Sequence, residues 1–452
     1  MTDALDSNGA TDVNGFTDKR PAPGRYGEDA RPTAVVVGGG VAGIVIARDL
    51  AAGGMRVTLL EASDHLGGKA VFHTVAGVEL DAGAESFATR RGTVASIAAE
   101  IGAPVEKPRE GGAWLQPTRG DAVKLPATNL LGIPGVPLAE DVVKIIGYRG
   151  AFRAQLDALM LGFRGSKQRN LGKLVRQRMG RAVLDDLVTP VVQGIHSKHP
   201  DELDVDVVAP GLRAELLSTG SLSAAVRSLR GASPAGSAVS GIRGGIAYLV
   251  ARLALDADRR GVRVLLNSPV TSVERDGVTL ADGEWVGANH VVLATTLEPA
   301  AAASIALVTL VLDAPELDDA PRGTGMLVAS GAEGVSGHSI GAKALTHSSA
   351  KWPWLAATLP AHRHVVRLSY NAPFPNDIED RARRDAEAML GVRIAPAAIL
   401  GSDVVEWTPV PPKPAPIDGV TLVGEAVSGT GLAAVIASAR HEAERMLGAL
   451  EP

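Results

Sequence analysis

The sequence predicts an α/β fold in which a parallel sheet is assembled from separate stretches of the chain. A β-branched strand at 34–37 runs into a glycine-rich turn and a helix, which is typical of a buried parallel strand. A similar strand, turn and helix recur after residue 420. Between about residues 95 and 230, apolar residues recur at three- and four-residue spacing, which predicts a helical region. We therefore expect a discontinuous, Rossmann-like nucleotide-binding domain, a helical subdomain and an α+β substrate domain.

The 452 residues are enough for about three such units. The first 31 residues hold no apolar periodicity and no apolar stretch of the kind found in signal peptides. The longest largely apolar run, 300–312, is shorter than a membrane-spanning helix, so we expect a cytoplasmic protein with at most peripheral membrane contact. The expected segments are a loose tail at 1–31, nucleotide-binding parts at 32–94, 231–298 and 406–452, a helical part at 95–230, and a substrate-binding part at 299–405.

The composition excludes several classes of function. Hydrophobic residues make up 46% of the chain and charged residues 21%, as in a globular protein. The net charge of −5 and the 3% aromatic content argue against a nucleic-acid partner. The chain has no cysteine, which excludes disulfides, cysteine-ligated metals and a flavin tethered through sulfur.

The first glycine-rich turn has the pattern of a dinucleotide-binding site. After the turn come a helix, a strand at 56–60 and then Glu61, which lies 23 positions beyond Gly38. Gly38 allows the tight turn, Gly40 lets backbone amides approach a pyrophosphate, and Gly43 lets the helix pack on the sheet. The helix N-terminus offers N–H groups to that anion, and Glu61 can accept hydrogen bonds from ribose hydroxyls. The turn residues expected at the cofactor are Gly38, Gly39, Gly40, Val41, Ala42 and Gly43.

A second glycine pair indicates that the dinucleotide is FAD. After Glu61 and Ala62 the chain reaches Gly67, Gly68 and Lys69. This arrangement resembles the flavoprotein extension of the dinucleotide motif, in which the basic residue contacts the cofactor. A strand and a loop of small residues follow, and the loop residues expected at FAD are Gly83, Ala84, Glu85 and Ser86. Because the chain lacks cysteine, we expect the FAD to be held non-covalently.

The end of the chain is expected to complete the same site. A strand at 420–423 leads into a further glycine-rich turn and a last helix. The dipole of this helix would stabilise an anionic reduced flavin at its N-terminus. No strand and acid follow the helix, so a second dinucleotide site is not expected. The residues expected at FAD here are Gly424, Glu425, Thr430, Gly431 and Leu432.

Several longer segments, taken together, resemble a known family. They are Asp81–Arg91, Gly132–Pro134, Pro190–Ser197, Gly323–Val328 and Lys343–Trp352. From about residue 32 onward the chain resembles the bacterial coproporphyrinogen III and protoporphyrinogen oxidases, especially their actinobacterial branch, within the amine-oxidase-like flavoproteins. The nucleotide motifs are common to that whole superfamily, whereas Lys343–Trp352 is much more specific.

The resemblance implies an FAD-dependent oxidase of heme biosynthesis. Such an enzyme converts coproporphyrinogen III to coproporphyrin III, or protoporphyrinogen IX to protoporphyrin IX, by removing six electrons while dioxygen is reduced to hydrogen peroxide. Its product would pass to an iron-inserting chelatase. The resemblance also implies a backbone contact of Val270 with adenine and a place for Trp407 at the flavin.

Substrate-binding and catalytic groups are less strongly indicated. A porphyrinogen needs a roomy apolar cavity with a few cations for its propionates, and Arg90, Arg91 and Lys351 are the candidates. His196, and after it His199, is a weak candidate for a proton acceptor, although a lone histidine is more often structural. The flavin itself accepts the hydride, so no metal is expected.

The chain departs from the family at two places, and two alternatives stay open. The stretch after Trp407 is compressed into a proline-rich segment at 407–416 that lacks the family's histidine. The final motif carries Thr430 and Leu432 where the family has valine and isoleucine. One alternative is a flavin amine oxidase, although Val427 stands where those enzymes have an aromatic residue. The other is a non-catalytic protein that binds FAD and porphyrin.

Overall fold

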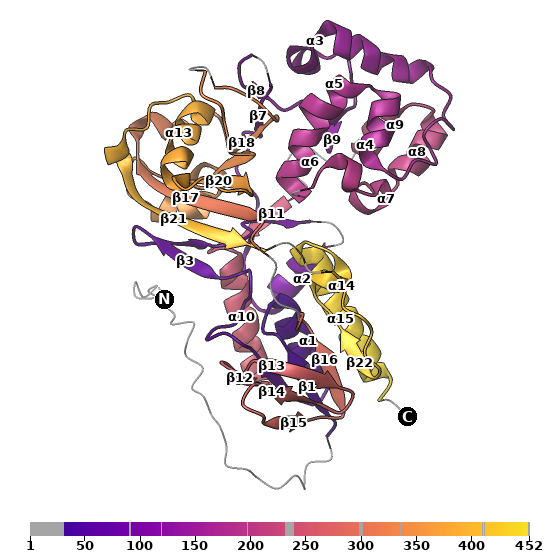
Figure 1. The fold of residues 1–452 in the computed structure, drawn as a ribbon, viewed down its shortest axis with the longest axis vertical. Coiled ribbons are helices and arrows are strands. Elements are labelled where there is room, and N and C mark those ends of the chain that lie inside the picture. The colour runs from indigo at the N-terminus through magenta and orange to yellow at the C-terminus, as the bar shows by residue number, and fades with distance from the viewer. Residues whose placement is uncertain are drawn as a thin grey trace, which may run out of the picture.

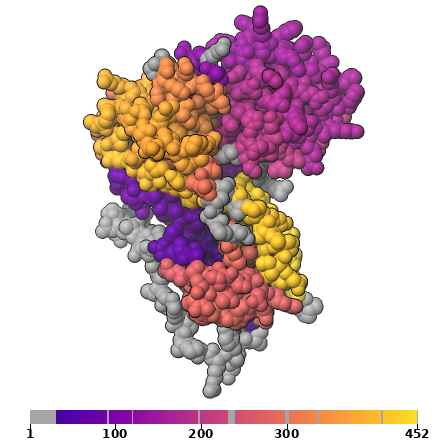
Figure 2. All heavy atoms as spheres, viewed as in Figure 1, coloured from indigo at the N-terminus to yellow at the C-terminus, as the bar shows by residue number. Residues whose placement is uncertain are grey.

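Three regions make up the molecule in the computed structural model. The structure describes residues 31–89, 92–118, 120–196, 198–230, 239–297, 302–334, 337–408, 410 and 412–450. A cofactor region with α1 and α15 lies at the bottom of Figure 1, below a helical region and a region in which α13 covers a sheet. In the space-filling view the two upper regions lie side by side above the cofactor region (Figure 2). All but the last residue of the expected tail at 1–31 lies outside the described residues.

A five-stranded sheet forms the centre of the cofactor region. Its strand order is β12-β2-β1-β16-β22, and every neighbouring pair is parallel. The sheet confirms the predicted α/β fold class, and its strands come from three separate stretches of the chain. The bounds are β1 Thr33–Val37, β2 Arg56–Leu60, β12 Arg263–Leu265, β16 His290–Leu293 and β22 Val420–Leu422.

Both faces of this sheet are covered. Successive side chains of a strand point to opposite faces, so Val36 joins one apolar cluster while Val35 and Val37 join another. The helices that cover the first face are α1 Val41–Ala52, α2 Thr93–Glu100, α10 Ile246–Arg259 and α15 Leu432–Gly448. The strands that cover the second are β13 Val270–Glu274, β14 Gly277–Leu280 and β15 Trp285–Gly287.

A seven-stranded mixed sheet forms the second region. Its order is β21-β17-β20-β19-β18-β7-β8, and α13, Ile378–Leu390, packs on it. The sheet extends beyond the expected segment 299–405, because β7 and β8 come from earlier in the chain. The bounds are β7 Trp114–Gln116, β8 Val123–Lys124, β17 Ile305–Asp313, β18 Gly325–Val328, β19 Ala344–His347, β20 Arg363–Asn371 and β21 Ile399–Trp407.

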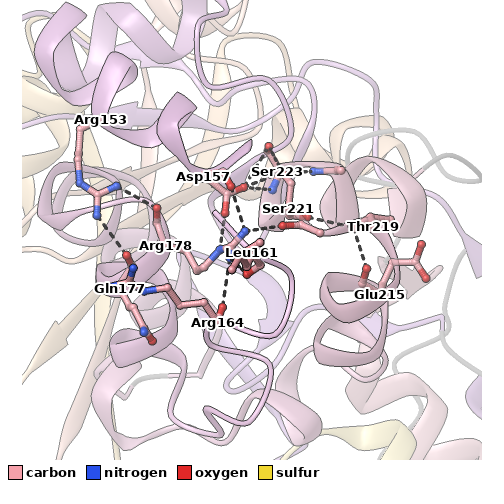
Figure 3. A network of polar contacts seen from close by, with 12 residues as sticks. Arg153, Asp157, Leu161, Arg164, Gln177, Arg178, Glu215, Thr219, Ser221 and Ser223 are labelled. Carbon is pink, nitrogen blue, oxygen red and sulfur yellow. Dashed lines mark hydrogen bonds and ion pairs between the residues drawn. The ribbon is translucent and has the colours of Figure 1, made fainter. Parts of the chain in front are cut away.

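The helical region contains the predicted apolar stripe as its core. Leu171, Leu174, Val183 and Leu187 are fully buried, which confirms that the stripe is packing surface. A closed network around Asp157 and Arg178 ties the helices together (Figure 3). The helices are α3 Glu140–Gln155, α4 Leu171–Arg178, α5 Arg181–Val183, α6 Thr189–His196, α7 Val205–Val208, α8 Leu212–Thr219 and α9 Leu222–Arg230, with one π-helical turn at Leu184–Val188.

The helical pattern does not extend over the whole predicted stretch from 95 to 230. Between α2 and α3 the chain forms short strands, because runs of two or three residues are too short to show a strand periodicity in the sequence. They are β6 Val105–Glu106, β7, β8, β9 Asn129–Leu130 and β10 Ile133–Pro134. None of the helices in the described ranges combines the length and the hydropathy that a bilayer crossing requires.

A ribbon and two short helices connect the cofactor region with the seven-stranded sheet. Strands β3 Phe72–Val75 and β4 Val78–Asp81 are paired, and their Val75 and Leu80 pack against Trp352 from the seven-stranded region. Trp352 lies between α11 Ser348–Lys351 and α12 Pro353–Thr358. The remaining elements near this junction are β5 Phe87–Ala88, β11 Val239–Ile242 and α14 Glu425–Ser428.

Candidate cofactor site

The glycine-rich turn between β1 and α1 is shaped by one positive backbone angle, one close contact and one open position. Gly38 has a φ of +101°, a conformation that favours glycine. A Cβ on Gly43 would lie 1.9 Å from the carbonyl oxygen of Gly38, so only glycine lets α1 begin this close to the strand. A Cβ on Gly40 would meet no atom within 4 Å. The turn therefore presents open backbone beside the N-terminus of α1, as a phosphate-binding turn must.

The Glu61 carboxylate lies against this turn. Its Oε2 accepts a hydrogen bond from the Gly39 amide at 2.6 Å, and its Oε1 accepts from the Ser63 amide at 2.8 Å. These bonds fix the carboxylate at the carboxyl end of β2, where a nucleotide ribose is bound in folds of this kind. Ala62 follows directly and leads the chain toward the second glycine pair.

The second glycine pair lies directly on the first turn. The Gly67 amide donates to the carbonyl of Gly39 at 2.9 Å, and a Cβ on Gly68 would come within 3.4 Å of the Gly40 Cα. Lys69 then reaches across to the end of the chain, where its Nζ lies 2.5 Å from Oε1 of Glu425. Both side chains keep about a third of their surface exposed. The structure thus joins two predicted cofactor residues whose pairing the sequence did not indicate.

The final helix completes this arrangement. Gly424 has a φ of +103° and a Cβ there would lie 3.0 Å from the carbonyl oxygen of Ala294, beside β16. Gly431 has a φ of +111°, and a Cβ there would meet nothing within 4 Å. Helix α15 begins at the next residue, Leu432, after Thr430 and Gly431. An open glycine at the N-terminus of a long helix fits the predicted contact with an anionic flavin.

The loop after β4 packs against the segment that carries Lys69. The Ala82 amide donates to the carbonyl of Val71 at 2.9 Å. A Cβ on Gly83 would lie 2.3 Å from the carbonyl oxygen of Lys69 and 3.7 Å from the ring of Trp407. Ala84 and Ser86 belong to the same loop. Through Ala82 and Gly83 the loop therefore packs on the segment that follows the second glycine pair.

Glu85 has protein partners that sequence reasoning did not identify. Its Oε1 accepts from Ser348 Oγ at 2.6 Å and from Arg367 Nη1 at 2.9 Å, and its Oε2 accepts from Trp352 Nε1 at 3.3 Å. The only sequence signal for Arg367 is a charged residue in the middle of β20, directly between the apolar Val366 and Leu368.

Asp81 is a second residue that sequence reasoning missed. Its carboxylate accepts hydrogen bonds from the amides of Ile246 and Ala247, at the first turn of α10. Burial raises the pKa of Asp81 to about 6, although these two amide donors act in the opposite direction. The sequence held a signal for each half of this contact: Asp81 ends a strand, and the glycine pair 244–245 precedes a helix. Nothing in the sequence indicates that the two halves meet.

Other predicted residues lie at the edges of this site or outside the described chain. Val270 begins β13, and Trp407 ends β21 with its Nε1 buried and without a partner in the described part of the protein. The Lys351 ammonium lies 4.9 Å from the centre of the Trp352 ring, and burial lowers its pKa. Arg90 and Arg91 lie outside the described residues.

The two candidate histidines lie in the helical region. His196 ends α6, and its side chain is outside the described residues. His199 has a structural use, because its Nδ1 accepts a hydrogen bond from the Asp201 amide at a short helical turn. Among the described residues no group of histidine, aspartate and glutamate side chains could hold a metal ion.

The residues present fit FAD. Two open glycines, Gly40 and Gly431, lie at the N-termini of two long helices, and Glu61 lies where a ribose would be bound. These features come from the beginning and the end of the chain and meet at the Lys69–Glu425 pair. A flavin dinucleotide has the phosphates, ribose and flavin that suit these groups.

Comparisons with known proteins agree with this geometry. Residues 41–329 match the family model described as flavin containing amine oxidoreductase. A coproporphyrinogen III oxidase from Propionibacterium freudenreichii is 28% identical and covers 92% of this chain and 90% of its own. The coproporphyrinogen III oxidase of Mycobacterium leprae is 28% identical over 74% of this chain and 76% of its own.

Solved structures establish the fold. A protein from Exiguobacterium sp. 255-15, named as a candidate protoporphyrinogen oxidase, superposes with a TM-score of 0.74 at 21% identity, over 94% of this chain and all of that one. Putrescine oxidase gives a TM-score of 0.62 at 16% identity over 92% of this chain and 99% of that one. The family match covers more than half of the chain and, with the geometry of the site, assigns FAD as the cofactor. The chain belongs to the family of flavin containing amine oxidoreductases.

Proposed function

We propose that this protein is an oxygen-dependent oxidase that converts coproporphyrinogen III to coproporphyrin III in heme biosynthesis. The observation that carries the proposal is the relative from Propionibacterium freudenreichii, whose likeness extends over nine-tenths of both chains and not over the nucleotide motifs alone. The segment Lys343–Trp352, which is more specific to the resembled family than the nucleotide motifs are, supports it, because its Ser348 and Trp352 contact Glu85 at the junction. Protoporphyrinogen IX is a second substrate of the same chemistry.

The overall reaction balances with dioxygen as the oxidant. Each porphyrinogen loses six electrons and six protons, and three molecules of dioxygen take them up as three molecules of hydrogen peroxide. Bound FAD supplies the two-electron chemistry, so three rounds are needed for each product. The protein would contribute binding and orientation: the N-termini of α1 and α15 would face the cofactor, and Glu61 would hold its ribose.

Cations are proposed to bind the carboxylates of the substrate. Lys351 lies at the junction of the two regions and is bound to no carboxylate within hydrogen-bond distance among the described residues. Arg90 and Arg91 follow the cofactor loop in the sequence and are proposed to serve the same purpose.

His196 is proposed as the proton acceptor. A cytoplasmic location, peripheral membrane contact and delivery of the product to an iron-inserting chelatase belong to the same proposal.

The ratio of the two products tests this function. Peroxide is measured with a coupled dye and porphyrin by its fluorescence, and both are corrected for oxidation in the absence of enzyme. We expect about three peroxides for each porphyrin, because a flavin carries two electrons at a time. A ratio near one, or porphyrin formed no faster than in the blank, would exclude the proposed reaction.

A flavin amine oxidase is the second candidate. It is favoured by the family description and by a Mycobacterium tuberculosis relative, described by its name as a candidate flavin-containing monoamine oxidase, that is 28% identical over 54% of this chain. An anaerobic titration separates the two. Coproporphyrinogen III should bleach the yellow flavin, whereas a panel of primary amines and polyamines should leave it oxidised. Bleaching by an amine alone would favour the second candidate, and bleaching by neither would indicate a binding protein without turnover.

A further inference from the structure

A buried group of charges lies at the junction between the cofactor region and the seven-stranded sheet. Its centre is Glu85, which accepts hydrogen bonds from Ser348, Trp352 and Arg367. The side chains of Glu85 and Arg367 keep only 11% and 7% of their surface exposed. Burial alone would raise the pKa of Glu85, but Arg367 and Lys351 together hold it below its usual range. The carboxylate is therefore ionised and held by groups from the other region.

Arg367 also binds the backbone of the cofactor loop. Its Nη2 donates to the carbonyl oxygen of Gly83 at 2.8 Å and to that of Ala82 at 3.2 Å. The guanidinium is planar and rigid, so one side chain fixes both the loop backbone and the Glu85 carboxylate. Arg367 belongs to β20, in the interior of the seven-stranded sheet. A strand of that sheet thus holds the loop at three atoms.

A continuous set of contacts leads from this arginine to the nucleotide turns. Gly83 packs on the carbonyl of Lys69, and the Lys69 side chain pairs with Glu425 ahead of α15. Gly68, next to Lys69, lies against Gly40 of the first turn. Every step is a direct contact, so a displacement of the 82–85 loop must move groups at which FAD is held.

We propose that Glu85 and Arg367 are positioning residues that hold the 82–85 loop, and with it the bound FAD, in a fixed relation to the seven-stranded sheet. The inference rests on FAD binding and is independent of which substrate the protein oxidises. Removing Arg367 has a second consequence, because it leaves the negative charge of Glu85 without its partner, and an added negative charge beside the site disfavours an anionic reduced flavin. Both FAD affinity and the reduction potential of the flavin should therefore depend on this residue.

Two substitutions separate the hydrogen bonds of Arg367 from its charge. Arg367→Met removes both, so the dissociation constant of FAD should rise about tenfold, as expected for the loss of hydrogen bonds to charged groups, and the potential should fall. Arg367→Lys keeps the charge but cannot reach Glu85 and both carbonyls at once. It should weaken FAD binding and leave the potential close to that of the parent.

Arg178→Met in the helical region is the matched control. Arg178 is also a buried arginine that binds a carboxylate and backbone carbonyls, but its partners all lie in the helical region. The measurements are FAD affinity by fluorescence quenching, the flavin potential by dye equilibration, and thermal unfolding of the complete protein. The control should lower the unfolding temperature and leave both flavin properties unchanged.

Equal flavin affinity and potential in Arg367→Met, Arg367→Lys and the parent would overturn the proposal and leave Arg367 a structural residue. If Arg367→Met does not fold, Glu85→Gln replaces it, because the amide keeps the shape of the side chain and removes its charge. That variant should also weaken FAD binding, and an unchanged affinity would contradict the proposal. If the parent protein fails to oxidise coproporphyrinogen III, the proposed function is refuted. The FAD affinities and flavin potentials of the variants would still test the role of Arg367.

Discussion

Two buried arginines of this protein have the same chemistry and different surroundings. Arg178 donates through all three of its nitrogens, to Asp157 and to the carbonyls of Leu161, Arg164 and Gly220 (Figure 3). Its partner Asp157 is equally enclosed, since Ser221 and Ser223 satisfy the other carboxylate oxygen. Arg367 instead spans two regions, and its buried Nε has no partner among the described residues.

The difference shows that burial and pairing alone do not reveal what an ion pair does. Removing one member of either pair leaves an uncompensated charge in the interior, so such a substitution is destabilising in both regions. In the helical region every partner of the ion pair belongs to the same core, so a substitution there should affect only the stability of that region. At the junction the partners are the cofactor loop and a strand of another sheet, so a substitution there should also change the binding and the potential of the flavin.

The largest expected effect is on stability, from Arg178→Met. Removing one member of a fully buried pair should lower the free energy of unfolding by about 3–5 kcal/mol. The FAD content of the folded fraction should remain that of the parent. Denaturant unfolding followed by circular dichroism, together with the flavin absorbance of the refolded protein, checks both parts. Loss of flavin from Arg178→Met at unchanged stability would contradict the proposed difference between the two arginines.

Acid pH should weaken the junction through His347, a buried neighbour of Ser348. Burial, and the nearby His364 when charged, lower the pKa of His347 to about 3. Because the folded pKa lies below the unfolded value of 6.5, the unfolded chain binds the proton more tightly between these limits. The contribution of His347 is therefore complete above pH 6.5 and is lost as the pH falls toward 3.

At pH 4 the expected loss from this histidine is about 3 kcal/mol of unfolding free energy. His347→Gln should remove that part of the pH dependence, as measured by denaturant unfolding at pH 7 and pH 4. The variant and the parent should differ in the slope between the two pH values. If the unfolding free energies of the variant and the parent fall equally between pH 7 and pH 4, His347 is not the group that causes the loss of stability.

Glu61→Gln should weaken FAD binding without loosening the fold. Replacing a charged acceptor costs about 1.5–3 kcal/mol per hydrogen bond, so the dissociation constant should rise about ten- to a hundredfold. Glu100→Gln is the control, since Glu100 pairs with Arg48 and Arg440 in the same region but away from the glycine-rich turn. Fluorescence titration of both variants should show the change only for Glu61. A FAD affinity equal to the parent's would show that Glu61 does not hold the ribose.

The smallest expected effects come from two serines that are equivalent in the two networks. Ser348 donates to Glu85 at 2.6 Å, and Ser221 donates to Asp157 at 2.7 Å. Each serine-to-alanine change should lower the free energy of unfolding by about 1–3 kcal/mol. Only Ser348→Ala should alter the flavin absorbance spectrum. A spectral change in both variants, or in neither, would remove the distinction between the networks.

The cofactor half of the site was predictable from the sequence because its chemistry is local. A strand, a turn of three glycines and a helix are contiguous, and Glu61 follows at the end of the next strand, so the pattern alone locates them. Glu425 and Gly431 were predicted in the same way, from a strand and a helix at the other end of the chain. The contact between Lys69 and Glu425 was not, because the two residues are 356 positions apart.

The junction could not be predicted, because every contact that forms it is long-range. Ser348 lies 263 positions from Glu85, and Arg367 lies 282 positions from it. Glu85 was predicted as a residue of the cofactor loop, yet nothing in its neighbours in the sequence indicates that its carboxylate contacts another region. The strands between 105 and 134 escaped notice for a different reason, since pieces of two or three residues carry no periodicity.

Because the cofactor sheet is built from three separate stretches of the chain, it cannot be completed until the last of them has been synthesised. The ribosome makes β1, α1 and β2 long before it makes α14, which carries Glu425, and α15, which supplies the second helix N-terminus. Until then the apolar face of α1 lacks Ile436, Ala439 and Met446, its partners in the finished core. We therefore expect the nascent chain to expose the apolar face of α1, and to bind FAD only after residues 420–448 have emerged and folded.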